Sequence, residues 1–325
     1  MDFTYNIIIH MREEMQKMMK TDRKKKLMKV VRAYQLYLML LVPTAMVFIF
    51  CYYPMYGAQI AFKKYNIVDG VFGSPWVGLM WLENFVGGKL FVDLLANTLI
   101  LNLYSLSMGF PLSIILAISL NYLTSVAYKK VIQMVSYAPY FISVVVMVGI
   151  MFTLFNPLYG VLGQFLSNIA GYPVDIFLSE SSFRHIFVWS GVWQGVGYGS
   201  IMYISVLSSV SPELHEAAII DGATILKRII HIDVPALMPT VVVMMILNTG
   251  GLLNTGFEKV LLLQNSLNLS TSEVIDTYSY KVGLASSMPN YSSGTMIGLF
   301  KSVVCFVLLL IVNKTAQKLG ESSLW

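Results

Sequence analysis

Six long apolar stretches dominate the pattern of hydrophobic and polar positions along this chain of 325 residues. Each stretch is long enough to cross about 30 Å of hydrocarbon as a helix. They are expected near residues 35–56, 94–120, 131–155, 185–209, 236–262 and 294–313. The segments assigned between them on the outer side hold Gly, Pro and aromatic residues, which favours short structured loops. The pattern therefore predicts an all-α integral membrane protein with six transmembrane helices.

Composition supports a membrane protein over a soluble domain. Hydrophobic residues make up 56% of the chain and the mean hydropathy is +0.68. Only 12% of the residues are charged, about half the usual share. Such a chain has too little polar surface to cover a globule in water. Cys51 and Cys305 both lie in apolar runs, so no disulfide framework is expected.

The basic residues are distributed as membrane sidedness requires. Nine Lys and Arg residues precede the first stretch, between Arg12 and Arg32, so the positive-inside rule places the N-terminus in the cytoplasm. Six spans then bring the C-terminus to the same side, with fifteen basic residues inside and five in the loops assigned outside. Residues 1–33 are predicted to be a basic cytoplasmic tail, and residues 34–325 the transmembrane domain. The net charge of +5 reflects this sidedness and does not indicate a nucleic-acid partner.

A polar insert, residues 211–235, separates the fourth and fifth apolar stretches. The segment Ser211–Glu213 has the features of a helix start: a hydroxyl cap, a proline at the first helical position and an acid in the first turn. Asp221 and Gly222 then end this helix after about two turns, because both residues tolerate turn conformations. A second short helix is expected to follow through three isoleucines, with a proline opening the next span: Ile225, Ile229, Ile232 and Pro235. The insert is therefore predicted to form a compact knob of two short helices.

The spacing within this insert resembles the coupling loop of ABC-importer permeases. That loop carries Glu-Ala-Ala, a Gly four residues after the second Ala, and a closing Ile-x-Leu-Pro, in which Val234 here replaces the Leu. The resemblance implies that the insert contacts an ATPase through Glu216, Ala217, Ala218, Asp221, Gly222, Ala223, Ile232 and Pro235. Small residues allow a partner surface to approach closely, and Glu216 offers a charge to a partner arginine. The alternative is an ordinary amphipathic connector.

Further blocks resemble one branch of these permeases, the carbohydrate-uptake (LplB-type oligosaccharide permease) family. The matching segments are 53–57, 74–79, 97–99, 109–112, 136–143, 256–258 and 276–280. Tyr140 stands where a His is common in the branch. The resemblance implies a type I ABC importer permease fold in the bacterial cytoplasmic membrane, with a cytoplasmic coupling loop at 211–235.

The same resemblance implies the partners and the cargo. The chain would pair with a second homologous permease, two ABC ATPase subunits and an extracellular sugar-binding lipoprotein, and would pass an oligosaccharide through the bilayer. No GxxxxGK[ST] phosphate cradle occurs, so ATP and magnesium are expected on the partner ATPase, with no cofactor and no enzymatic activity in this chain. Two alternatives are an ABC permease for an amino acid or peptide, and an ion-coupled secondary carrier.

One short segment begins like a metal-binding motif, but the motif is incomplete. His215 and Glu216 begin like the HExxH of zinc proteases, but the fifth position is Ile219. The second histidine ligand is therefore missing, and the other histidines do not rebuild the spacing. No metal site is expected.

Polar residues near the predicted midplane are candidates for a substrate pathway. Tyr198 lies about 11 residues, roughly 17 Å, from the cytoplasmic end of the fourth span, and Asn248 lies at a similar depth in the fifth. Gln194 is one turn from Tyr198 on the same face. Such groups are costly against lipid, so they are predicted to face protein or a cavity. Tyr140, after Pro139 in the third span, is added on the same reasoning; the alternative for all four is hydrogen bonding between helices.

Lys301 is a charge inside the last apolar stretch, about two turns from its outer end. An ammonium at that position needs a partner. Glu258, near the outer end of the fifth stretch, is the expected one. The pair is interpreted as structural and not as a proton relay.

Overall fold

The computed structural model describes residues 33–318 and 323. In this part of the chain the regular structure is helical and no strand forms, although an isolated antiparallel bridge joins Lys63 and Trp76. The predicted all-α class is confirmed. The predicted cytoplasmic tail, 1–33, lies outside the described residues except for Ala33.

The chain divides into two compact units, residues 1–59 and 60–325. The described part of the first unit is helical from Tyr34, and the helix runs on as far as Phe62. It comprises α2 (Tyr34–Val47), η1 (Phe48–Tyr52), α3 (Tyr53–Met55) and the start of η2 (Tyr56–Phe62). The turn at η1 is widened, with the Tyr53 N–H donating to the Phe48 carbonyl. Pro54 follows directly and has no N–H for a normal helical bond, which accounts for the wider turn.

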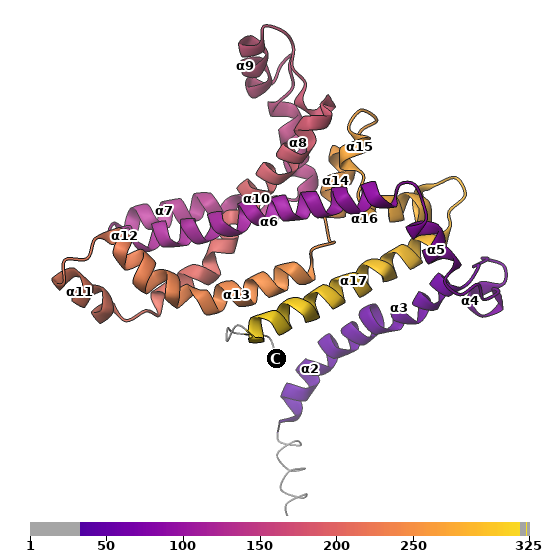
Figure 1. The fold of residues 1–325 in the computed structure, drawn as a ribbon, viewed down its shortest axis with the longest axis horizontal. Helices are drawn as coiled ribbons and strands as arrows, with labels where there is room; N and C mark the ends of the chain where they lie inside the picture. The colour runs from indigo at the N-terminus through magenta and orange to yellow at the C-terminus, as the bar shows by residue number, and fades with distance from the viewer. Residues whose placement is uncertain (1–32, 319–322, 324–325) are drawn as a thin grey trace, which may run out of the picture. The chain divides into compact units, whose positions relative to one another are not determined.

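The second unit carries the remaining elements. They are α4 (Gly70–Gly73), α5 (Met80–Val86), α6 (Phe91–Asn121), α7 (Val126–Tyr137), η3 (Ala138–Phe141), α8 (Val144–Leu154), α9 (Val161–Ala170), η4 (Ile176–Leu178), α10 (Glu180–Ser208), α11 (Pro212–Ile220), α12 (Ile225–Arg228), η5 (Ile229–Asp233), α13 (Val234–Gly250), α14 (Phe257–Leu263), α15 (Leu269–Ser272), α16 (Ile275–Tyr280), η6 (Lys281–Ala285) and α17 (Tyr291–Lys318). In Figure 1, α13 and α17 run side by side below α6.

Four helices of the described chain are long and apolar enough to span a membrane: Tyr34–Phe62, Phe91–Asn121, Ile225–Gly250 and Tyr291–Lys318. The bent pair α7–α8 would make a fifth span. The 29-residue α10 matches the predicted fourth span in position, but Gly, Ser, Gln and charged residues lower its hydropathy. The presence of several membrane-spanning helices is therefore confirmed, while the total of six remains a prediction.

The predicted third span, near 131–155, is broken in the structure. Its two parts, Val126–Phe141 and Val144–Leu154, meet at an angle of 103°. Pro139 cannot donate a helical hydrogen bond, and Ser143 starts a new helix by accepting from the Val146 N–H at 3.3 Å. A proline and a serine cap thus divide an apolar run that hydropathy alone joins.

The predicted fifth span, 236–262, is wrong at both ends. The helix starts at Ile225, so the second helix of the insert continues directly into the span. It stops at Gly250, and a left-handed Gly256 (φ 70°) redirects the chain into the separate helix α14. Pro235 does not open a new span. It lies just after the widened turn η5, where the Val234 N–H donates to the Ile229 carbonyl, so it is accommodated without a break.

Glycine allows the helices of the second unit to pack closely. A Cβ on Gly197 would lie 1.9 Å from the Ser136 carbonyl oxygen, so α10 and α7 touch through backbone at this point. A Cβ on Gly250 would lie 2.5 Å from Leu309 Cδ1, which brings α13 against α17. Packing is therefore the role of these two glycines.

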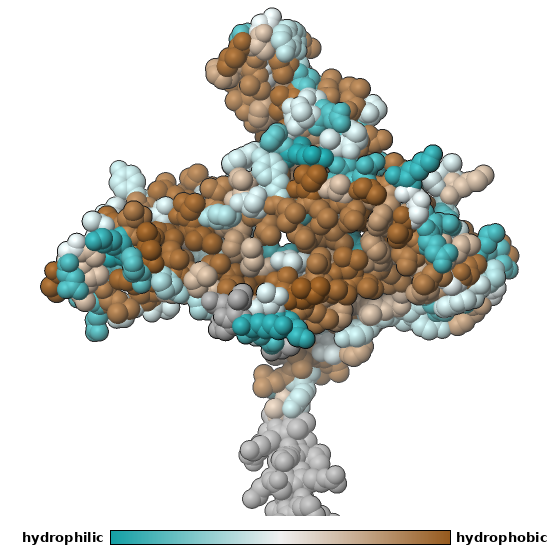
Figure 2. Space-filling view, viewed as in Figure 1, coloured by the Kyte–Doolittle hydropathy of each residue, from teal (hydrophilic) through white to brown (hydrophobic). Residues whose placement is uncertain are grey.

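Hydrogen bonds show which loops share an end of the second unit. Tyr122 donates to Asp233 at 2.7 Å, which joins the end of α6 to the insert. At the other end the Tyr65 N–H donates to Ser292 Oγ at 3.0 Å. Figure 2 shows hydrophilic residues around α11 and around the loops at the far end of the long helices, with a hydrophobic zone between them. This grouping is the one that the predicted topology requires, and the side of the membrane that each end faces stays a prediction.

Candidate functional sites

The insert 211–235 folds into a short helix and a tight turn. Pro212 and Glu213 occupy the first turn of α11 as predicted, while the Ser211 side chain stands at the cap without a hydrogen bond to the helix. The helix ends at Ile220 with Asp221 as its C-cap, and Gly222 takes the left-handed conformation with φ 73°. That backbone favours glycine, which explains the Asp-Gly pair.

The turn is closed by the Ala223 N–H, which donates to the Ala218 carbonyl at 2.8 Å. Of the eight residues predicted to contact an ATPase, three are half-buried in this chain: Ala218, Ala223 and Ile232. The other five are exposed: Glu216, Ala217, Asp221, Gly222 and Pro235. Ile220, at the tip of α11, is 86% exposed. The insert thus presents apolar and charged groups that this chain does not cover.

Beneath α11, a buried carboxylate ties the insert to α6. Asp233 is fully buried, accepts the Tyr122 hydroxyl hydrogen bond at 2.7 Å, and lies 3.4 Å from Nε2 of His215. Arg228 lies over the Tyr122 ring, with its Cζ 5.5 Å from the ring centroid. Burial, together with the bond to Asp233, raises the pKa of Tyr122 to about 12, so the phenol remains a donor at neutral pH. The four side chains hold the base of the insert in a fixed position against α6.

Sequence reasoning missed this cluster. Asp233 stands immediately before the predicted fifth span, where an acid next to an apolar run is a recognisable signal. His215, the candidate ligand of the incomplete zinc motif, faces Asp233 instead. Among the described residues no group of three or more His, Cys, Asp and Glu side chains is placed to hold a metal ion.

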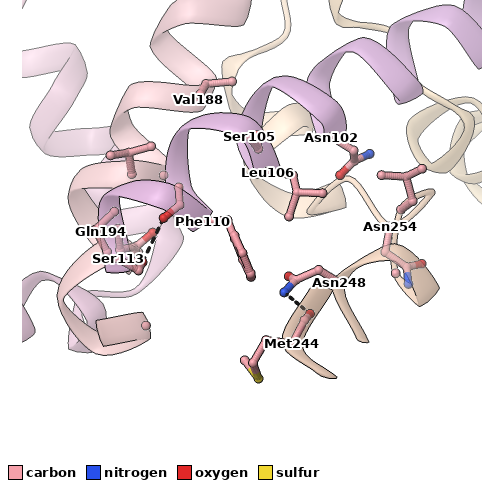
Figure 3. A pocket seen from close by; sticks show the side chains of 18 of the residues that line it. Asn102, Ser105, Leu106, Phe110, Ser113, Val188, Gln194, Met244, Asn248 and Asn254 are labelled. Carbon is pink, nitrogen blue, oxygen red and sulfur yellow. Dashed lines mark hydrogen bonds between the residues drawn. The ribbon is translucent and has the colours of Figure 1, made fainter. Parts of the chain in front are cut away.

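A cavity of about 600 Å³ lies between α6, α10, α13 and the segment leading into α14 (Figure 3). Its apolar wall includes Phe110, Phe187 and Leu247. Its polar lining residues are Asn102, Ser105, Ser113, Gln194, Tyr203, Asn248, Asn254 and Lys259. Amides and hydroxyls supply both donors and acceptors, the groups that pair with the hydroxyls of a polar solute.

Two of the four predicted pathway residues line this cavity. Gln194 reaches it from α10 and also donates to the Ile142 carbonyl at 2.8 Å. Asn248 reaches it from α13 and donates to the Met244 carbonyl at 2.7 Å. Gln194 therefore combines the two roles that the sequence left open, cavity lining and a hydrogen bond between helices.

The other two predicted residues, Tyr140 and Tyr198, lie together outside the cavity lining. Their rings stack with centroids 3.8 Å apart and an interplanar angle of 4°. Both side chains are exposed on the second unit. The structure thus separates the four candidates into an amide pair in the cavity and an aromatic pair on a surface of η3 and α10.

Six polar lining residues escaped the sequence reasoning, among them Asn102, Asn254 and Lys259. Asn102 donates to Thr255 Oγ1 at 3.0 Å and links α6 to the chain after α13. Asn254 lies in the turn beyond Gly250, which was predicted to be helical. Lys259 was a visible signal, because it is a charge within the predicted span 236–262.

The prediction that Glu258 pairs with Lys301 is wrong. Its Nζ donates to Asp276 of α16, which packs against α17. Glu258 is exposed on α14, because the fifth helix ends at Gly250 and does not carry Glu258 toward Lys301. The interpretation of Lys301 as one member of an ion pair nevertheless matches the geometry.

Comparison with known proteins adds sequence and fold relatives. A profile of the family described as binding-protein-dependent transport system inner membrane component matches residues 109–320. The polygalacturonan/rhamnogalacturonan transport system permease protein YteP of Bacillus subtilis (strain 168) is 36% identical over 306 residues, covering 94% of this chain and 95% of that protein. Protein LplB of the same organism is 38% identical over 288 residues, covering 88% and 90%.

Chains in two solved transporter structures are also similar to this chain in fold and sequence. A chain in the crystal structure of a bacterial ABC transporter involved in the import of the acidic polysaccharide alginate has a TM-score of 0.80 and 34% identity, covering 89% of this chain and 97% of that chain. A chain of the bacterial alginate ABC transporter in complex with alginate pentasaccharide-bound periplasmic protein has a TM-score of 0.81 and 33% identity, covering 91% and 98%.

Proposed function

Because the chain belongs to the binding-protein-dependent transport system inner membrane component family, among its sugar ABC importer permeases, we propose that it carries an oligosaccharide across the membrane. It is a multi-pass membrane component and not an enzyme, and the ATPase is a separate subunit. The proposal includes a second homologous permease, two ATPase subunits and an extracellular lipoprotein that delivers the sugar. ATP and magnesium belong to the ATPase.

The exposed insert is the observation that carries the proposal. Glu216 and Ile220 on α11 are exposed, and no other segment of the described chain covers them. The left-handed turn at Gly222 fixes the direction in which the helix points. A charged and apolar knob of this kind suits docking into a cleft on an ATPase.

The helix Ile225–Gly250 supplies the mechanical connection from this knob to the cavity. It runs without a break from the turn after Gly222 to the cavity-lining Asn248. Asp233 fixes its first part to the end of α6, which also lines the cavity. A shift of the insert on ATP binding is therefore transmitted to α13 and to α6, which form two walls of the cavity. Such a shift requires that the ATPase hold the insert differently in its two states.

The cavity suits a sugar in size and in chemistry. A volume of about 600 Å³ falls within the range typical of small-molecule sites. Its amides pair with hydroxyl groups, and its aromatic and aliphatic walls suit sugar ring faces. Among the relatives, YteP is named for transport of polygalacturonan/rhamnogalacturonan, and the solved transporter is described as importing the acidic polysaccharide alginate. Tyr140 and Tyr198, stacked and exposed, extend the path toward the second permease in this proposal.

Charge reversal of the insert tests the coupling. Glu216→Lys, expressed with the ATPase subunits and the second permease, is expected to reduce co-purification of the ATPase at least about 10-fold and to abolish ATP-driven uptake, since a like charge opposes a partner arginine. Gly222→Asp is expected to act in the same direction, through the left-handed backbone.

Glu83→Lys makes the same charge change on α5, at the other end of the long helices, and should leave ATPase association unchanged. Normal association and uptake in both insert variants would refute the role given to the insert. Uptake that survives ATP depletion and collapses with the proton or sodium gradient would instead identify an ion-coupled carrier.

A further inference from the structure

Lys259 is the charged side chain among the residues that line the cavity. It lies on α14 and is only 8% exposed. Its Nζ donates to the Phe187 carbonyl at 2.6 Å and lies 4.6 Å from the centroid of the Phe187 ring. The ammonium reaches α10 where that helix has no side chain, since a Cβ on Gly191 would lie 3.2 Å from Nζ.

The surrounding carboxylates do not neutralise this ammonium. In the part of the chain that the structure describes, the ion pairs formed by lysines are Lys281–Glu273 and Lys301–Asp276. Glu258, the residue before Lys259 on α14, is exposed. Lys259 thus brings a positive charge to the cavity without a carboxylate partner.

Burial of an ammonium without a counter-charge costs free energy unless another group compensates the charge. An ammonium has three donors and prefers water or anions around all of them. A carbonyl and an aromatic face are partial substitutes, because neither carries a net charge. An anion that enters the cavity supplies the missing charge, and its binding is favoured by the low polarisability of the surroundings.

We propose that the cavity selects acidic oligosaccharides, with Lys259 as the ammonium that meets a carboxylate of a uronic acid unit. The inference rests on the proposed function, because it specifies the chemical class of the sugar that the cavity takes. The hydroxyls of the same unit are then paired by the amides of Gln194 and Asn248 across the cavity.

A purely structural role for Lys259 makes a different prediction. If the side chain only ties α14 to α10 through the Phe187 carbonyl, its removal weakens the binding of acidic and neutral sugars equally. If it binds a carboxylate, its removal lowers affinity for the acid alone. The ratio of the two affinities therefore separates the roles, even in a variant of reduced stability.

The experiment compares trigalacturonate with its uncharged methyl ester. Binding of each is measured by titration calorimetry to the purified transporter, assembled with its second permease and ATPases and without the binding lipoprotein. The wild type is expected to bind the acid about 10-fold or more tightly than the ester, as for a charge-assisted hydrogen bond. Lys259→Met is expected to bring the ratio near one, while Lys259→Arg keeps the preference. Lys281→Met, which removes a lysine that does not line the cavity, is the matched control and should leave the ratio unchanged.

The outcomes also distinguish the two proposals. Equal binding of acid and ester by the wild type, or an unchanged preference in Lys259→Met, overturns the assignment of Lys259 and leaves the transport function intact. A transporter that neither binds these sugars nor drives ATP-dependent uptake of any oligosaccharide overturns both.

Discussion

Lys301 shows how a single charge inside an apolar helix is stabilised. Its ammonium is paired with Asp276, and both side chains are largely shielded from solvent. Removal of one partner leaves the other charge unpaired in a poorly polar setting, which is more damaging than the absence of the pair.

We therefore expect Lys301→Met to destabilise the protein by about 1–3 kcal/mol, a value reduced for the partial exposure of the pair. The measurement is the apparent melting temperature of the purified transporter. Glu258→Gln, which changes the partner expected from the sequence, should have little effect. Lys301→Met combined with Asp276→Leu should recover part of the loss, and a double variant as unstable as the sum of both single changes would contradict the pairing.

Positions estimated along the predicted helices identified some residues well. They failed where the estimate depended on where a helix ends. Asn248 was placed from the helical rise and Gln194 from its position one turn from Tyr198, and both line the cavity, whereas Tyr198 does not. Glu258 was assigned to Lys301 because the fifth span was drawn too long. Tyr140 and Tyr198 were each predicted to line a substrate pathway, and their stacking was not predicted, because it depends on the break at η3, which hydropathy does not show.

At the scale of whole helices, breaks and widened turns account for most differences between expectation and structure. Prolines act in two ways here. Pro139 precedes the sharp bend between α7 and α8, whereas Pro54 and Pro235 follow widened turns within continuous helices. The sequence shows the proline in each case. It does not show whether the helix bends sharply or continues through a widened turn, since that depends on how neighbouring helices pack.

Close packing of α7 against α10 gives a test at this scale. Gly197→Ala places a Cβ 1.9 Å from the Ser136 carbonyl oxygen, so the two helices must separate. We expect a destabilisation of about 1–3 kcal/mol, as for other overpacked sites, and a lower yield of assembled transporter on size-exclusion chromatography. Gly149→Ala on α8 is the matched control, because its Cβ meets nothing within 4 Å. Equal behaviour of the two variants would show that the contact is not tight in the assembled protein.

At the scale of the molecule, the arrangement of loops follows from pairs of distant segments that the sequence does not connect. The positive-inside count assigned residues 57–93 and 263–293 to one side, and the structure joins these segments through Tyr65 and Ser292. It likewise joins the end of α6 to the insert through Tyr122 and Asp233. Charge statistics could predict this grouping because few basic residues fall outside, but the hydrogen bonds that enforce it depend on the fold.

Cysteine labelling tests this topology. In a background with Cys51→Ala and Cys305→Ala, Val68→Cys and Met288→Cys are expected to react with a membrane-impermeant maleimide on intact cells, since the two side chains are 90% and 88% exposed. Thr124→Cys and Ile220→Cys, at the end that holds the insert, should react only after permeabilisation. The members of each pair must behave alike whichever way the protein is inserted, because hydrogen bonds join their segments within one unit. Split labelling within a pair would contradict the fold, whereas exchange of the two pairs would contradict only the predicted orientation and would place the insert beyond the reach of a cytoplasmic ATPase.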